Sequence, residues 1–225
     1  NVFEGADYKL LKTIKFADDA DNVRYDSARG LVFVAHAEKA LGVVDAKTFA
    51  VKADITLPGT AEGLASAAGQ PRLFVALPSP SEVVVVDPEK KEVVEKFPVK
   101  TASGGHPIAL DETGKRLFVG CRKAPMVVVM DMESGKEVTG VPIPDGVDDL
   151  FYDAKRKRLF ASCGDGFVAV IRQLDADHYG TAEKLETVKG AKTAYLDSDS
   201  GRLFLAVPRQ AGKPGPEIRV YRIRD

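Results

Sequence analysis

Residues Leu110–Asp131, LDETGKRLFVGCRKAPMVVVMD, contain the pattern that decides the fold. An Asp ends one apolar segment, a polar turn follows, an Arg-Leu-Phe segment runs to a small residue, and a valine-rich segment ends at a second Asp. The same order recurs around five phenylalanines, Phe33, Phe74, Phe118, Phe160 and Phe204, which lie 41, 44, 42 and 44 residues apart. A period of about 40–45 residues with about four short strands per repeat is typical of a β-propeller, in which each repeat forms one blade.

The repeats predict an all-β, five-bladed β-propeller with four antiparallel strands in each blade. We expect a single domain with blades at residues 18–57, 60–99, 104–143, 146–188 and 190–225. The fifth repeat is one strand short, and the segment Tyr8–Phe16 (YKLLKTIKF) resembles the last strand of the other repeats. We therefore expect Tyr8–Phe16 to pair beside Glu217–Ile223 and close the ring, because closure leaves only short, protected sheet edges.

Composition limits the classes of partner. The 225 residues include 32 Lys and Arg against 33 Asp and Glu, so the basic excess typical of a protein that binds nucleic-acid phosphates is missing. The longest apolar runs, such as Val83–Val86, are far shorter than the roughly 20 residues of a membrane-spanning helix. We expect a monomer that binds no nucleic acid and has no membrane span. The first residue is Asn1 rather than Met, which fits an exported protein after removal of its signal peptide.

Three segments resemble the YVTN/YncE-type propeller repeats of bacterial exported and surface proteins: Ile108–Arg122 (IALDETGKRLFVGCR), Val83–Val99 (VVVVDPEKKEVVEKFPV) and Leu150–Cys163 (LFYDAKRKRLFASC). The resemblance covers nearly the whole chain from Tyr8 onward. It implies a propeller fold, a periplasmic or secreted location and a role in binding or as a scaffold. Members of that family commonly have seven blades, whereas this chain has five repeats.

The repeat also predicts where a binding site would form. In a propeller the loops before each first strand gather at one mouth of the central channel. The residues at this position, twelve before each repeat phenylalanine, are Asp21, Glu62, His106, Asp148 and Lys192. All five are ionisable. We expect a charged channel mouth that holds a cation or a polar ligand, although polar residues at a solvated loop can also be purely structural.

Metal binding is a weaker alternative at two places. The carboxylates of Asp21, Glu62 and Asp148 could hold a hard divalent ion. A second ring, three residues after each phenylalanine, consists of His36, Leu77, Cys121, Cys163 and Val207. Its Cys121 and Cys163 could bind a soft metal together with His36 or with His106, but two small buried thiols fit the pattern better. Equivalent positions in adjacent blades are too far apart for a disulfide, so we expect two free cysteines.

Two local features concern the turns. Arg116, Arg158 and Arg202 each precede Leu-Phe, and we expect them to brace the Asp that ends the preceding strand. The fourth repeat contains a longer turn, Gln173–Ala182, before its last strand.

Three functions remain open from the sequence. The first is an exported, non-catalytic propeller that binds a small ligand, metal ion or protein partner at the charged mouth. The second is a metal-dependent, lactonase-like hydrolase that uses the same mouth. The third is a structural module for protein interaction. The first is favoured because the sequence contains no convincing set of acid, base and oxyanion-binding groups. We therefore expect a protein without enzymatic activity and without a cofactor other than a possible divalent metal.

Overall fold

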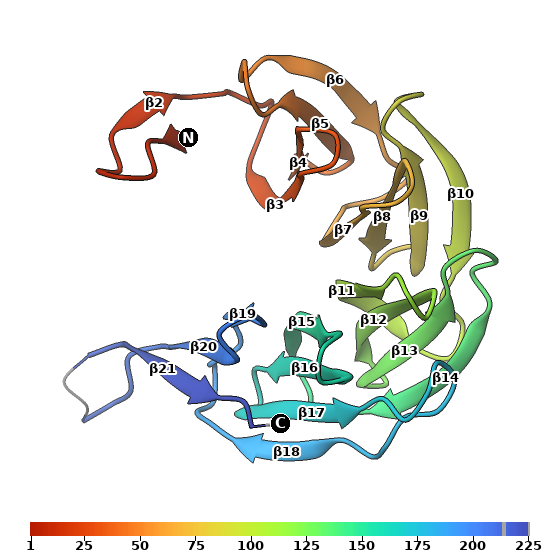
Figure 1. The fold of residues 1–225 in the computed structure, drawn as a ribbon, viewed down its shortest axis with the longest axis vertical. Coiled ribbons are helices and arrows are strands. Elements are labelled where there is room, and N and C mark those ends of the chain that lie inside the picture. The colour runs from red at the N-terminus through yellow and green to blue at the C-terminus, as the bar shows by residue number, and fades with distance from the viewer. Residues whose placement is uncertain (213–214, 225) are drawn as a thin grey trace.

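The structure is a computed structural model that describes residues 1–212 and 215–224. Five β-sheets are arranged around a common axis and form the blades of a β-propeller (Figure 1). No helix occurs among the described residues, and therefore none that could cross a membrane. The predicted all-β, five-bladed fold is confirmed.

The blades are numbered here in chain order. Blade 1 consists of β3 (Ala20–Asp26), β4 (Leu31–His36), β5 (Ala40–Asp45) and β6 (Val51–Thr56). Blade 2 consists of β7 (Gly63–Ala67), β8 (Arg72–Leu77), β9 (Glu82–Asp87) and β10 (Glu92–Pro98). Blade 3 consists of β11 (Ser103–Asp111), β12 (Arg116–Lys123), β13 (Met126–Asp131) and β14 (Glu137–Pro142). Blade 4 consists of β15 (Val147–Asp153), β16 (Arg158–Cys163), β17 (Phe167–Arg172) and β18 (Glu183–Glu186). Blade 5 consists of β19 (Ala194–Asp197), β20 (Arg202–Val207) and β21 (Glu217–Arg222).

Each blade is an antiparallel meander whose first strand lies next to the axis and whose last strand lies outside (Figure 1). Blades 1 to 4 have the predicted four strands, whereas blade 5 has three among the described residues. The second and third strands of blades 2 and 3 are apolar on both sides, as expected for strands buried between two neighbouring sheets.

The predicted ring closure by the N-terminal segment is wrong. Strand β2 (Leu10–Lys12) pairs with β1 (Val2–Phe3) in a separate two-stranded sheet, and β21 has only β20 as its neighbour. The partner of β2 is thus the strand closest to it in sequence, which has the lower entropic cost of loop closure. The similarity of Tyr8–Phe16 to a last strand identified the kind of strand correctly but assigned it to the wrong sheet.

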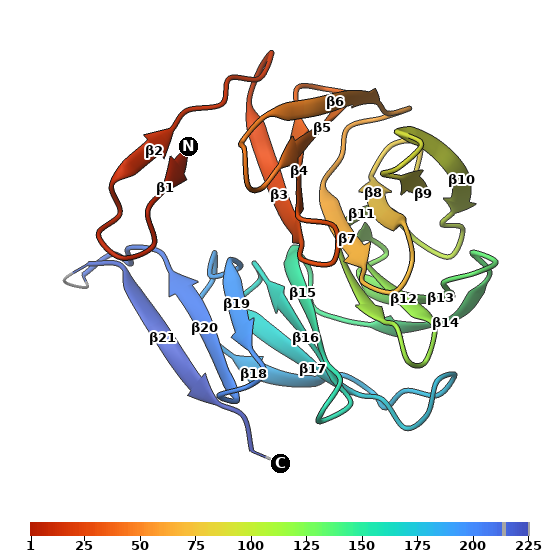
Figure 2. The same ribbon diagram turned by 45° about the horizontal axis from the view of Figure 1, so that its top comes forward.

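Buried apolar clusters join neighbouring blades. Four clusters fill the interfaces between blades 1 and 2, 2 and 3, 3 and 4, and 4 and 5. The repeat phenylalanines Phe33, Phe74 and Phe118 are completely buried in the first three. Among the described residues no such cluster joins blade 5 to blade 1, and the two blades lie apart on that side of the molecule (Figure 2).

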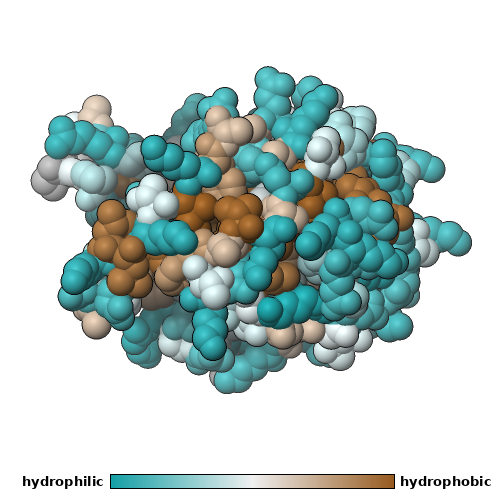
Figure 3. Space-filling model, turned by 90° about the horizontal axis from the view of Figure 1, so that it is seen from above, coloured by the Kyte–Doolittle hydropathy of each residue, from teal (hydrophilic) through white to brown (hydrophobic). Residues whose placement is uncertain are grey.

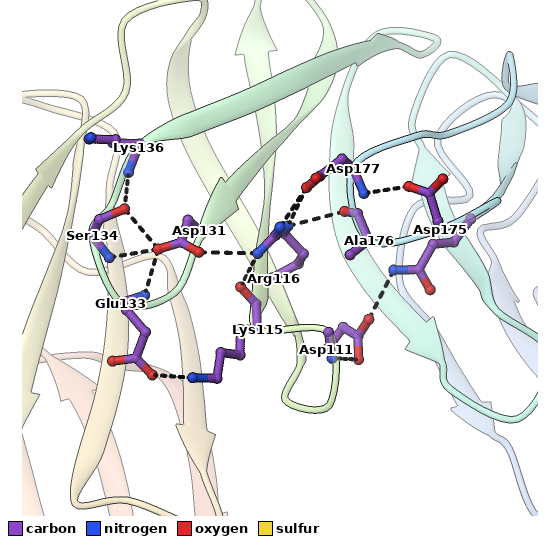
Figure 4. Close-up of polar contacts among 12 residues, drawn as sticks. Asp111, Lys115, Arg116, Asp131, Glu133, Ser134, Lys136, Asp175, Ala176 and Asp177 are labelled. Carbon is purple, nitrogen blue, oxygen red and sulfur yellow. Dashed lines mark hydrogen bonds and ion pairs between the residues drawn. The ribbon is translucent and has the colours of Figure 1, made fainter.

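The arginines before Leu-Phe differ in their partners: the charge of Arg202 acts on the preceding Asp197 as predicted, and Arg158 Nη1 donates to the carbonyl oxygen of Arg224 at 2.6 Å. Arg116 does not brace the preceding Asp. In blade 3, Arg116 binds Asp131, at the end of β13, with Nη1 and Oδ2 3.1 Å apart, and it also binds Asp177 (Figure 4). The Asp that ends the first strand is held instead from within its own turn, as in the Arg29–Asp26 pair at 2.8 Å. Arg116 lies opposite both Asp111 and Asp131 in the two ladders of β12, so register leaves either carboxylate within reach. Asp111 is already bound by the N–H of Gly114 and by Gln173 Nε2, which leaves Asp131 as the partner of the guanidinium.

The long connection Gln173–Ala182 attaches blade 4 to blade 3. The buried side chain of Gln173 donates through Nε2 to Asp111 Oδ2 of blade 3 at 2.9 Å. The carbonyl oxygen of Ala176 accepts a hydrogen bond from Arg116 Nε at 3.1 Å (Figure 4). The extra length of this turn therefore provides contacts between two blades.

Candidate ligand-binding site at the channel mouth

The five residues predicted for the mouth line one cavity of about 440 Å³. Its walls are formed by Asp21, Glu62, His106, Asp148 and Lys192 together with Asn22, Arg122, Asp149 and Thr193. Every one of these side chains is polar. The five residues predicted from the repeat spacing thus lie together, and four further residues line the same cavity.

Backbone irregularities aim three of these side chains. The pairing register shifts between Ala20 and Asn22 in blade 1, around Asp21. Similar shifts surround His106 in blade 3 and Asp148 in blade 4. A β-bulge bends its strand and re-aims a side chain. In three blades the residue at the mouth thus leaves the regular ladder at the start of the first strand.

Two cations neutralise Asp148. Its Oδ1 lies 3.2 Å from Lys192 Nζ and also contacts Arg122 Nη2. Arg122 is held in place because its Nε donates to the carbonyl oxygen of Val147 at 2.8 Å. This part of the mouth is an ion cluster whose charges largely satisfy one another.

The opposite part of the mouth carries carboxylates with weaker partners. Glu62 Oε2 lies 3.7 Å from His106 Nε2, which is longer than a hydrogen bond. The other imidazole nitrogen, Nδ1, is 3.2 Å from the carbonyl oxygen of Gly104 and must donate to it. Asp21 is exposed, and its side chain has no hydrogen bond or ion pair among the described residues. Asp21 and Glu62 are consequently available to an incoming donor.

Asp149, a further carboxylate of the mouth, has a raised pKa. Its half-buried position raises its pKa by desolvation, and the neighbouring Asp148 adds to this rise. The backbone N–H of Ala194, which donates to Asp149 Oδ2 at 2.7 Å, opposes the rise, as do Arg24 and Lys192. Desolvation lowers the pKa of Arg24, in the first strand of blade 1, and the negative charge of Asp149 opposes this change.

A sequence signal for these additional residues exists. Positions eleven residues before the repeat phenylalanines include Asn22, Asp149 and Thr193, which all line the cavity. The position nine residues before Phe33 is Arg24, whereas Ala65 and Ala109 occupy the equivalent positions in blades 2 and 3. A scan of the positions next to the first ring would therefore have found three of the four additional lining residues but not Arg122, which lies in the second strand of blade 3, four residues after Phe118.

The structure does not assemble the predicted carboxylate metal site. Asp21, Glu62 and Asp148 line the same cavity, but in the described part of the chain no three His, Cys, Asp or Glu side chains lie close enough together to hold a metal ion. Asp148 is engaged by two cations, and Asp21 is exposed at the rim.

The second predicted ring is part of the interior. Leu77, Cys121, Cys163 and Val207 are buried in the clusters between blades. Both cysteines are free, as predicted, and burial raises the pKa of each thiol to about 12. They remain protonated near neutral pH, whereas a metal ligand must be a thiolate. The fifth member, His36, stacks on Phe16 and lies 3.0 Å from Asp54. This ring therefore packs the blades together.

The comparisons with known proteins support the propeller. No protein-family profile matches the chain. The chain is 25% identical over 214 residues to the uncharacterized protein YncE of Salmonella typhimurium strain LT2, and to that of Salmonella typhi. Each match covers 91% of this chain and 58% of the relative.

The structure is also similar to hydrazine synthase of Kuenenia stuttgartiensis. The TM-score is 0.74 and the identity 16%, over 95% of this chain and 65% of that one. This similarity shows the fold alone. The chain spans less than two thirds of the length of these YncE proteins and of this hydrazine synthase chain. The chain is therefore a β-propeller in structure and is similar in sequence to YncE.

Proposed function

We propose that the protein binds a small hydrophilic ligand that carries an amine and hydroxyl groups in the cavity at the channel mouth. The observation that carries the proposal is the convergence of nine polar side chains, from all five blades, on one cavity of about 440 Å³. Ligand pockets commonly have volumes of about 300–1,000 Å³, so the cavity fits a small molecule.

The distribution of charge supports an amine. Asp148 is neutralised within the protein by Arg122 and Lys192, whereas Asp21 and Glu62 have no short partner. An ammonium group would form charge-assisted hydrogen bonds with these two carboxylates, which are stronger than neutral hydrogen bonds. Asn22 and Thr193 add amide and hydroxyl groups that fit hydroxyls of a ligand.

The alternative functions have less support. A metal-dependent hydrolase needs a ligand cluster, and none is assembled among the described residues. An exported location remains part of the proposal and is supported by the resemblance to YncE-type repeats.

A thermal-shift panel with spermidine, glucosamine, glucose and citrate tests the proposal. We expect the amines spermidine and glucosamine to raise the melting temperature most, because they can pair with both free carboxylates. The double variant Asp21→Asn, Glu62→Gln should lose that rise. The control Glu89→Gln, which changes an exposed glutamate after β9, should keep it. An equal rise in all three proteins, or a larger rise with citrate than with the amines, would refute the proposal.

A further inference from the structure

The N-terminal hairpin has the same turn as the third-to-fourth-strand connections of blades 1 to 3. In the hairpin, the N–H of Tyr8 donates to the carbonyl oxygen of Glu4 at 3.1 Å. The equivalent hydrogen bonds are Phe49 to Asp45 at 2.8 Å, Lys91 to Asp87 at 2.8 Å and Gly135 to Asp131 at 2.9 Å. Tyr8, Phe49, Lys91 and Gly135 all have a positive φ, between 56° and 66°. Since a positive φ is uncommon outside glycine, this agreement is specific.

The strand register agrees as well. Phe3 pairs with Leu10 and Val2 with Lys12, with a bulge between the two pairs. Blade 1 has the same arrangement, with Val44 paired with Val51 and Val43 with Ala53. Strands β1 and β2 are therefore equivalent to β5 and β6, the third and fourth strands of a blade.

The segment after this hairpin packs on blade 1 through a glycine. A Cβ atom at Gly42 would lie 2.4 Å from Cε1 of Phe16, so only glycine leaves room for this ring. The equivalent residues of blades 2 and 3, Val84 and Val128, are completely buried against the preceding blade. Phe16 thus occupies the place where a preceding blade would contact blade 1.

The hairpin covers only the outer part of that face. Val34 and Val44 of blade 1 are buried, and a cavity of about 220 Å³ separates this region from Ile14 and Phe16. On the first strand, however, Val23 is 52% exposed and Tyr25 60% exposed. The residues equivalent to Val23 in blades 2 to 4 are Leu64, Ile108 and Leu150, which are at most 4% exposed. Apolar patches are visible from the side of β2 and β6 (Figure 3).

We propose that β1–β2 is the outer half of a further blade. We further propose that the free edge of β1, with Val23 and Tyr25, is the docking surface for the inner half of that blade. The occupant is a hairpin of the first two strands of this repeat, joined in cis to β1. In blades 1 to 3 the second strand leads through a short turn directly into the third, which places the hairpin next to β1 in the same polypeptide.

The existing interfaces show what this hairpin must contain. In blade 1 the repeat phenylalanine, Phe33, packs in the same cluster as Leu64 of the next blade. By the same relation, the phenylalanine of the docked hairpin packs against Val23. Its second strand pairs with the edge of β1, as β4 pairs with β5.

A graft tests the proposal with the whole chain. A copy of residues 60–83, which include the first two strands of blade 2, is placed directly before Asn1, so that the copied Glu82 and Val83 continue into β1. We expect the melting temperature to rise by about 5–10 °C, because Val23, Tyr25 and the grafted phenylalanine become buried. The fluorescence of the dye ANS, which reports exposed apolar surface, should fall by about half.

Matched variants identify the surface. Phe74→Asp within the grafted copy, or Val23→Asp in blade 1, should abolish the rise in melting temperature. Val94→Asp, at another exposed valine, should leave the rise intact. An equal melting temperature with the intact graft and with its Phe74→Asp version would overturn the proposal. So would light scattering that finds the ungrafted chain as a dimer disrupted by Val23→Asp, because a second copy would then cover the face.

Discussion

Two aspartates of the protein have pKa values that are shifted in opposite directions. Asp149 is half-buried, and its pKa is raised chiefly by desolvation. Asp197, in a turn of blade 5, has its pKa lowered because the hydroxyl and backbone N–H of Ser200 donate to its carboxylate. The two aspartates should therefore influence stability in opposite directions as the pH changes.

The variant Asp149→Asn tests this perturbation. Because its pKa is raised, Asp149 binds its proton more tightly in the folded state than in the unfolded state. Ionisation of Asp149 therefore reduces the stability of wild type as the pH rises from the ordinary pKa of Asp to the raised pKa of Asp149. The melting temperature of the variant, relative to wild type, should increase with pH across that interval and then stay constant. The Asn side chain can still accept the hydrogen bond from Ala194.

Asp197→Asn provides the matched comparison. Stability from its lowered pKa is present above the ordinary Asp value and is lost as the pH falls through the folded value. This variant should be less stable than wild type at neutral pH, with a difference that shrinks in acid. Parallel pH profiles for the two variants would contradict the assigned environments.

At the scale of elements, the connection between β17 and β18 shows how one loop links two blades. Gln173 is only 5% exposed, accepts a hydrogen bond from the Tyr152 hydroxyl at 2.5 Å and donates to Asp111 at 2.9 Å. The ion pair between Arg116 and Asp177 of the same loop (Figure 4) has an exposed carboxylate, because the side chain of Asp177 is 55% exposed. Buried hydrogen bonds are costly to leave unmade, whereas surface ion pairs contribute little.

Gln173→Ala should therefore lower the free energy of unfolding by about 2–4 kcal/mol, because the partners of Gln173 in blades 3 and 4 lose their hydrogen bonds within the protein. Asp177→Ala should change it by less than about 1 kcal/mol. Urea denaturation measures both. Equal effects of the two variants would show that the buried network does not link the blades.

The elements also show what could be predicted from the sequence. The repeat phenylalanine places the strands and the mouth residues, because strand alternation and turn chemistry are local and recur in every blade. The partner of Tyr8–Phe16 could not be found in this way, since a fourth-strand pattern specifies a kind of strand and not its neighbour. Arg116 was assigned to the wrong Asp because it lies opposite both Asp111 and Asp131 in the folded sheet. The sequence does not show that Gln173, from a distant loop, already binds Asp111.

At the scale of the whole molecule, five repeats produce two different surfaces. The mouth collects one ring residue from each blade, so it exists once in the molecule. On the side between blades 1 and 5, two faces are not covered by a complete blade among the described residues (Figure 2). Val23 and Tyr25 are exposed on blade 1, and Tyr195 and Val220 are exposed on blade 5. A ligand that binds the mouth should therefore bind once per chain, whereas binding to a feature of each blade would give about five sites.

Isothermal titration calorimetry with the amine that stabilises the protein most tests this claim directly. We expect one site per chain and about tenfold weaker binding for Asp21→Asn or Glu62→Gln alone. The double variant should lose less binding free energy than the sum of the two single losses, because one ligand contacts both carboxylates. A stoichiometry well above one, or the same affinity in wild type and variants, would contradict the proposal of a single binding site at the channel mouth.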